Sequence, residues 1–136
     1  MPELPEVQAH AERLGTAFDG AELAAFTPLT FTALKTAVPP PDEAVGHALS
    51  GVDRRGKFLL MRFAGAPTFV VHLMQGGRLV PDEQQSRRPR NGLARWTFSD
   101  GRALLLTEAG TERKAGVWVL AGDPLDQPPL DRLGVD

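Results

Sequence analysis

The chain has 136 residues, of which 42% are hydrophobic, and this is enough to build one domain around a single core. It contains no cysteine, which excludes disulfides and thiolate zinc sites within this sequence. No apolar stretch approaches the roughly 20 residues needed to cross a bilayer, and the first residues lack the basic and apolar segments of a signal peptide. We therefore expect a soluble, cytoplasmic protein without a membrane partner.

The formal net charge is only −2, but the charges are distributed unevenly along the chain. Residues 1–53 and 115–136 are acidic, whereas residues 54–114 contain 12 of the 15 Lys and Arg residues. A basic middle of this kind is suited to facing phosphate groups. A solvated surface of mixed charge explains the pattern equally well.

One helix is predicted at the start of the chain. Apolar residues recur there at spacings of three and four, which places them on one face of a helix; they are Leu4, Val7, Ala11, Leu14 and Phe18. Pro5 is tolerated in the first turn, where the amide has no intrahelical partner, and Asp19-Gly20 ends the helix. A short strand is then expected at residues 22–29.

From about Gly46 the pattern changes to short apolar runs broken by Gly, Pro, Asp or Asn. Seven such runs occur, at residues 48–52, 58–63, 68–73, 78–80, 94–98, 103–107 and 117–120. Ser99-Asp100-Gly101 is a typical hairpin turn. Brief runs at this spacing favour a mainly β fold, either a sandwich or a barrel. The predicted fold class is a two-layer antiparallel β-sandwich, with the N-terminal helix, and room for a second short helix, packed alongside.

Two segments lack apolar periodicity. Residues 81–92, rich in Gln, Arg and Pro, are predicted to form an exposed, mobile loop. Residues 123–136 are Pro-rich and acidic, which is typical of an interdomain linker. The expected organisation is one domain at residues 1–122, followed by the start of a linker at residues 123–136.

The chemically most distinctive segment is the start of the chain, Met1-Pro2-Glu3-Leu4-Pro5-Glu6-Val7. Cellular aminopeptidases generally remove Met before a small residue such as Pro, which leaves Pro2 with a free secondary amine. An α-amino group has a pKa near 8, so roughly a tenth of it is neutral at pH 7, and a neutral amine can attack a carbon electrophile. Attack on a sugar C1′ would displace the base and leave an iminium ion that acidifies the C2′ hydrogen.

The adjacent Glu3 is placed to protonate the sugar ring oxygen or to shuttle the proton. Taken alone, the same segment is more simply explained as a helix start with favourable carboxylates.

Two further motifs lie at the boundaries of predicted strands. Arg54-Arg55-Gly56-Lys57 places a lysine in a glycine turn that opens a strand, and His72-Leu73-Met74-Gln75-Gly76-Gly77 follows a strand and breaks at two glycines. In order and spacing, these motifs and the N-terminal one resemble the formamidopyrimidine-DNA glycosylase / endonuclease VIII family, and the resemblance runs over the whole chain.

The resemblance implies an enzyme of base excision repair, a bifunctional DNA glycosylase and abasic-site lyase that removes oxidised bases from damaged double-stranded DNA. By similarity, Pro2 would be the Schiff-base nucleophile, Glu3 the acid/base and Lys57 a proton donor beside the DNA backbone. His72 matches a phosphate contact of the family. Without the family, Lys57 is an ordinary turn lysine and His72 a hydrogen-bonded residue at a strand end.

The family flips the target nucleotide out and fills the gap with side chains, and here the sequence departs from the pattern. The formamidopyrimidine branch usually has Met at the wedge position, whereas this chain has Gln75 there and Met74 just before it, so either could be the wedge. The second filling loop, Arg-Arg-Phe-Gly in that branch, corresponds to Arg113-Lys114-Ala115-Gly116. Arg113 and Lys114 are expected DNA contacts, but Ala115 has no ring to intercalate, which leaves lesion preference open.

The arginines of residues 87–90 are candidates for additional phosphate contacts, although a merely solvated loop is an equally good interpretation. The family usually continues with a helix-two-turn-helix segment and a four-cysteine zinc finger. We therefore expect an N-terminal domain that acts as a monomer and holds no metal or cofactor of its own, with the structural zinc in the C-terminal part. While Met1 is present it acylates Pro2, so the unprocessed chain is expected to be inactive.

Two other functions remain open from the sequence. A damaged-DNA-binding relative without catalytic activity is suggested by Gln75 and Ala115. A β-sandwich interaction domain that binds an acidic partner through its basic middle would account for the composition without the family.

Overall fold

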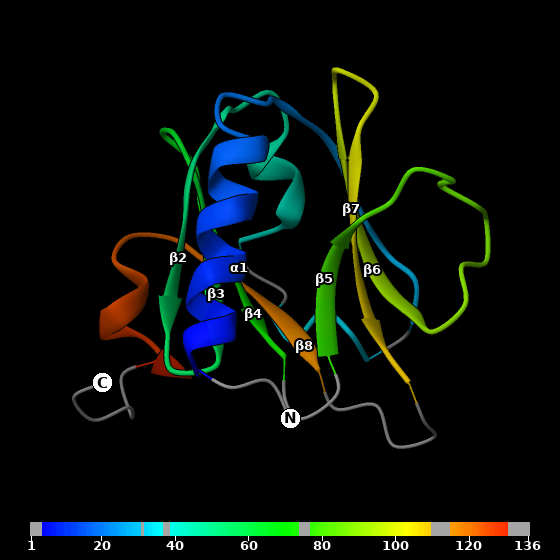
Figure 1. Ribbon diagram of the computed structural model, residues 1–136. Coiled ribbons are helices and arrows are strands. Elements are labelled where there is room, and N and C mark those ends of the chain that lie inside the picture. Colours follow the sequence, from blue (N-terminus) through cyan, green and yellow to red (C-terminus); the bar gives the residue numbers. More distant parts are fainter. Residues whose placement is uncertain (1–3, 31, 37–38, 74–76, 110–114, 131–136) are drawn as a thin grey trace.

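The part of the chain that the structure describes forms two packed β-sheets with one α-helix beside them (Figure 1). The computed structural model describes residues 4–30, 32–36, 39–73, 77–109 and 115–130. In these residues one sheet has the order β1-β6-β7-β5 and the other the order β2-β3-β4-β8, and neighbouring strands within each sheet are antiparallel. The predicted two-layer sandwich with an N-terminal helix is therefore confirmed.

The bounds of the strands agree closely with the predicted apolar runs. The first sheet contains β1 (Leu23–Pro28), β5 (Gly77–Pro81), β6 (Gly92–Phe98) and β7 (Ala103–Glu108). The second contains β2 (Leu49–Arg55), β3 (Phe58–Phe63), β4 (Thr68–His72) and β8 (Gly116–Leu120). Where the structure describes the chain, the only other helical segments are two 3-10 turns, at Pro41–Ala44 and Pro124–Asp126.

Helix α1 (Leu4–Ala17) closes one side of the sandwich, between the edge strands β2 and β5. The predicted stripe is buried where the structure describes it: Val7, Ala11, Leu14 and Phe18 are each at most 3% exposed. On one flank Arg54 Nε of β2 donates to Gln8 Oε1 at 3.1 Å. On the other, the His10 Nε2 nitrogen hydrogen-bonds to the Leu79 carbonyl of β5. The start of α1 is thereby held at the end of the molecule where the β2–β3 turn lies (Figure 1).

The main core lies between the two sheets and under α1. Its centre is aromatic: the Trp96 ring of β6 contacts Phe26 of β1 and Phe69 of β4, with centroids 5.0 and 5.8 Å apart. Burial of large apolar side chains is the dominant favourable term in folding. The position of this core between the layers therefore fixes the two sheets relative to each other.

A second, smaller apolar cluster covers the outer face of the β2-β3-β4-β8 sheet. Leu130 is 3% exposed and packs there with Phe58, Leu60, Val70 and Leu120. Residues 124–130 thus fold back on the sheet, although the sequence suggested a linker from residue 123. The boundary between domain and linker stays a prediction.

Candidate active site

The β2–β3 turn and the end of β4 bring Lys57 and His72 together. Gly56 adopts a φ of 60°, a left-handed conformation that glycine enters without a Cβ penalty, and Lys57 follows it directly. Phe58 and His72 are paired across β3 and β4, with ring centroids 4.2 Å apart in an edge-to-face arrangement. The predicted lysine turn and histidine motif are therefore neighbours in the fold.

The environment of His72 favours its neutral form. Burial lowers the pKa of His72 below its usual 6.5, and the positive charge of Lys57 lowers it further, while the charge of Glu108 opposes both. At neutral pH the imidazole is therefore mainly uncharged and acts as a hydrogen-bonding group.

Glu108 is a residue of this region that the sequence reasoning missed. It ends β7, is only 6% exposed, and its Oε1 accepts a hydrogen bond from the Ala115 amide at 3.0 Å. Its own amide donates to the Asn91 carbonyl at 3.1 Å, and it is paired with Gly77 across β5 and β7. Through its backbone Glu108 joins the starts of β5 and β6, and through its carboxylate it holds the approach to β8. The only sequence signal was a charged residue directly after an apolar run.

Lys35 is another residue of this region that the sequence reasoning missed. Its backbone amide donates to the Val117 carbonyl at 2.7 Å, and its side-chain stem lies over Gly116, where an added Cβ would collide with the Lys35 Cε atom. Gly116 in turn is paired with His72 across β8 and β4. Lys35 therefore adds positive charge to the same end of the sandwich.

A surface hollow lies between α1 and β5, next to this region. Val7, from the second turn of α1, lines it together with Leu73 and Gly77, which flank residues 74–76. Arg13 and Arg78 add two guanidinium groups to its lining. One depression is therefore bordered by α1, which follows the N-terminal motif, and by Leu73 and Gly77, which follow His72.

Most of the other predicted site residues lie outside the described part of the chain. Of the expected catalytic set, Lys57 is described and Pro2 and Glu3 are not. Of the expected DNA contacts, His72 is described, whereas the positions of the others stay predictions; these are Met74, Gln75, Arg113 and Lys114.

Neither a metal cluster nor a membrane-spanning helix occurs in the described residues. No three His, Asp or Glu side chains of that part of the chain are grouped as metal ligands would be. No helix there is long and apolar enough to cross a membrane.

Solved structures with the same arrangement of sheets and helix define the class of fold. Lactococcus lactis Fpg, solved with DNA containing an abasic site, superposes with a TM-score of 0.79 at 18% identity, over 91% of this chain and 46% of that one. A structure of MutM with DNA containing carbocyclic 8-oxo-G gives a TM-score of 0.79 at 20% identity, over 91% and 46% of the two chains. The fold is thus that of part of these DNA-bound proteins.

Sequence comparison identifies the family. The formamidopyrimidine-DNA glycosylase N-terminal domain matches residues 1–118, so the chain belongs to the formamidopyrimidine-DNA glycosylase family. It is 34% identical over 137 residues to the formamidopyrimidine-DNA glycosylase of Halorhodospira halophila, covering 98% of this chain and 49% of that protein. The corresponding protein of Thiobacillus denitrificans is 34% identical over 136 residues, with coverages of 98% and 48%. The chain therefore spans about half the length of these relatives.

Proposed function

We propose that the chain is the catalytic N-terminal part of a base excision repair glycosylase that removes oxidised bases from damaged duplex DNA. The observation that carries the proposal is the juxtaposition of Lys57 and His72 in a chain of this family, since both match residues that the family uses on DNA. The proposed partner is damaged double-stranded DNA, and the proposed active form is a monomer from which Met1 has been removed.

In the proposed reaction, the neutral amine of Pro2 attacks C1′ of the damaged nucleotide. The N-glycosidic bond breaks with its electron pair on the base, which takes up a proton. The sugar ring then opens as Glu3 protonates the ring oxygen, and an iminium ion forms between Pro2 and C1′.

The same intermediate supports the lyase step. Loss of the C2′ proton from the iminium ion expels the 3′ phosphate, which cleaves the strand, and water later releases the sugar from Pro2. Lys57 would supply a proton and hold its positive charge beside the DNA backbone. His72, in its neutral form, would donate a hydrogen bond to a phosphate oxygen.

Sodium borohydride reduces an iminium ion to a stable amine and so tests the proposal directly. The Met1-processed chain should become covalently attached to an oligonucleotide carrying an abasic site, and Pro2→Gly and Glu3→Gln should reduce the attachment. The matched control is the same chain with Met1 retained, which should give no adduct because its Pro2 nitrogen is an amide. Absence of an adduct from the processed chain, or an adduct unaffected by these changes, would contradict the proposal.

A second candidate function is favoured by Ala115. This residue occupies the position of an intercalating Phe in the related loop, yet it is 2% exposed and its amide is bound by Glu108. A buried methyl group cannot fill the space left by a flipped base. A damaged-DNA-binding protein without catalysis would bind an abasic duplex more tightly than an intact one, and would produce neither a nick nor a borohydride adduct.

A further inference from the structure

The loop between β5 and β6 carries a concentrated positive charge. Within its residues 82–91, the side chains of Arg87, Arg88 and Arg90 are all exposed. We refer to residues 86–90 as the arginine loop. Among the described residues, the ion pairs join other side chains and include none of these three.

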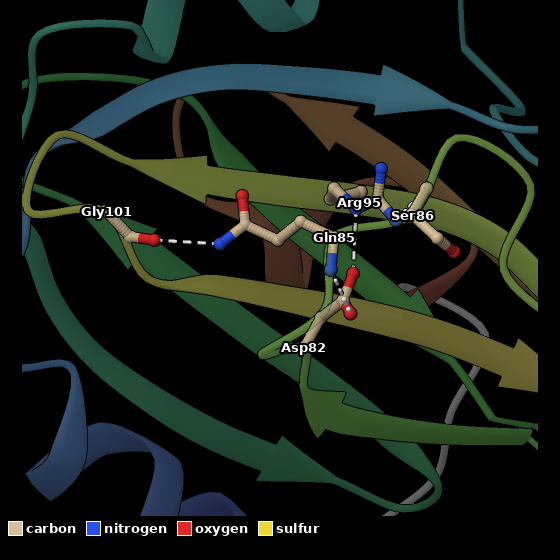
Figure 2. Close-up of polar contacts among 5 residues, drawn as sticks. All are labelled: Asp82, Gln85, Ser86, Arg95 and Gly101. Carbon is tan, nitrogen blue, oxygen red and sulfur yellow. Dashed lines mark hydrogen bonds and ion pairs between the residues drawn. The ribbon is translucent and has the colours of Figure 1, made fainter.

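The base of the loop is held by a nearly buried ion pair (Figure 2). Arg95 Nε of β6 donates to Asp82 Oδ2 at 2.8 Å, and the two side chains are only 11% and 9% exposed. The other oxygen of Asp82 accepts from the Gln85 amide at 3.0 Å. Arg95 also reaches the loop itself, because its Nη2 donates to the Ser86 carbonyl at 2.7 Å. Asp82 and Arg95 therefore fix the point where the arginine loop begins.

Two further contacts limit the path of the loop. Gln85 Nε2 donates to the Gly101 carbonyl at 2.8 Å (Figure 2). At the far end, Gly92 lies so close to Pro89 that an added Cβ would be 2.6 Å from the Pro89 Cγ atom, and Asn91 accepts a hydrogen bond from the Glu108 amide. Glu108 is paired with Gly77 across β7 and β5, and the Gly77 amide donates to the carbonyl of Leu73, the residue after His72, at 2.7 Å. The loop therefore ends beside the candidate active site.

We propose that the arginine loop is a preordered arm that binds phosphates of the duplex next to the candidate active site. The inference rests on the proposed function, which brings DNA to this end of the molecule. Guanidinium groups bind phosphate oxygens in a bidentate manner. A loop that is fixed before binding loses less conformational entropy when it meets its ligand. The arm would add affinity without reading bases, since phosphate contacts carry no sequence information.

The first test measures binding of the whole chain to fluorescent duplexes, with and without an abasic site, between about 50 and 200 mM salt. Replacing Arg87, Arg88 and Arg90 together by Gln should weaken binding on the order of tenfold for each lost contact at about 0.1 M salt, and should reduce the salt slope by about 0.9 per contact. The triple Lys variant should retain the slope. Arg62→Gln removes a partly exposed cation, paired with Asp53, at the opposite end of β3 and should leave the slope unchanged.

The second test separates order from charge. Asp82→Ala and Asp82→Asn raise the net charge equally, but only Asn retains an oxygen that can accept from the Gln85 amide. If net charge alone attracted DNA, both variants would bind more tightly than the parent chain. The proposed arm instead requires that Asp82→Ala binds more weakly than Asp82→Asn, with all three arginines still present.

The outcomes distinguish this inference from the proposed function. An unchanged salt slope in the triple Gln variant, or tighter binding by Asp82→Ala than by Asp82→Asn, would overturn the arm while leaving glycosylase function intact. If the parent chain bound neither duplex, the proposed function would fail and the arm with it. The Gln substitutions are at exposed positions, so they decide the question even if Asp82→Ala fails to fold.

Discussion

The two ends of the sandwich organise their charged residues in different ways. At the end formed by the β6–β7 turn, Arg102 pairs with Asp100, two residues away, at 2.8 Å, and its guanidinium group lies 4.3 Å from the centroid of the Phe18 ring. At the opposite end, Lys57, His72 and Glu108 come from the β2–β3 turn, β4 and β7 (Figure 1). No carboxylate of the described residues forms an ion pair with Lys57.

The difference indicates what each end is suited to do. A local pair such as Asp100 and Arg102 satisfies its own charges and helps to order a turn, but exposed pairs of this kind contribute little to stability. At the other end, no described carboxylate forms an ion pair with Lys57, and the carboxylate of Glu108 is buried. The positive charge of Lys57 is therefore available for a ligand. The comparison therefore predicts that substitutions at the Lys57 end affect chemistry, whereas those at the Arg102 end affect only the turn and the end of α1, which Arg102 contacts through Phe18 and the Ala17 carbonyl.

The largest expected effect is that of Lys57→Met, which removes the ammonium group and keeps an unbranched stem. If Lys57 donates a proton in the reaction, strand nicking under single-turnover conditions should slow by about 100-fold or more. Arg102→Gln is the control at the other end, where the nicking rate should not change. Equal rates for Lys57→Met and the parent chain would remove the functional distinction between the two ends.

Next in size is the effect of Glu108 on stability. Glu108→Ala leaves the buried Ala115 amide without its acceptor, which should lower the free energy of unfolding by about 1–3 kcal/mol. Glu108→Gln keeps an oxygen in place and should cost less. Urea unfolding with unchanged m-values would measure both. Equal losses for the two variants would show that the hydrogen bond to Ala115 is not what Glu108 contributes.

The helix and the strands could be predicted because periodicity reports burial directly. Val7, Ala11, Leu14 and Phe18 had to lie on one face, whatever they packed against, and a run such as residues 103–107 had to be buried in any sheet. The choice of partners could not be predicted. β1 pairs with β6 and β5 with β7, and nothing in the local sequence of β5 specifies which distant strand it will meet.

The same limit applies to the candidate site. Lys57 and His72 lie in motifs that are local in the sequence, a glycine turn and a strand end followed by two glycines, but their roles were predicted only from the resemblance to the family. Glu108 and Lys35 were missed because each acts on a residue distant in sequence: Lys35 packs on Gly116, and the charge of Glu108 affects the pKa of His72. The Asp82–Arg95 pair was missed for the same reason, so residues 81–92 were predicted to be mobile although nearly buried side chains hold their base. The roles of Pro2 and Glu3 stay predictions.

The smallest expected effects concern the dependence of stability on pH. The two ends of the sandwich should respond in different pH ranges. Burial and Lys57 depress the pKa of His72 below 6.5 in the fold, so the unfolded chain gains a proton first and stability should decline as the pH falls below 6.5. The hydrogen bond from Arg102 depresses the pKa of Asp100 below 3.8, so its contribution should disappear only in more acidic solution, as the pH falls through the lowered pKa. NMR titration of the His72 imidazole measures the pKa of this group directly. In Glu108→Gln its pKa should fall further, since the opposing negative charge is gone, whereas Asp100→Asn should leave it unchanged. A His72 pKa at or above 6.5 in the parent chain would mean that the field of Lys57 and the burial of the ring do not govern the site end.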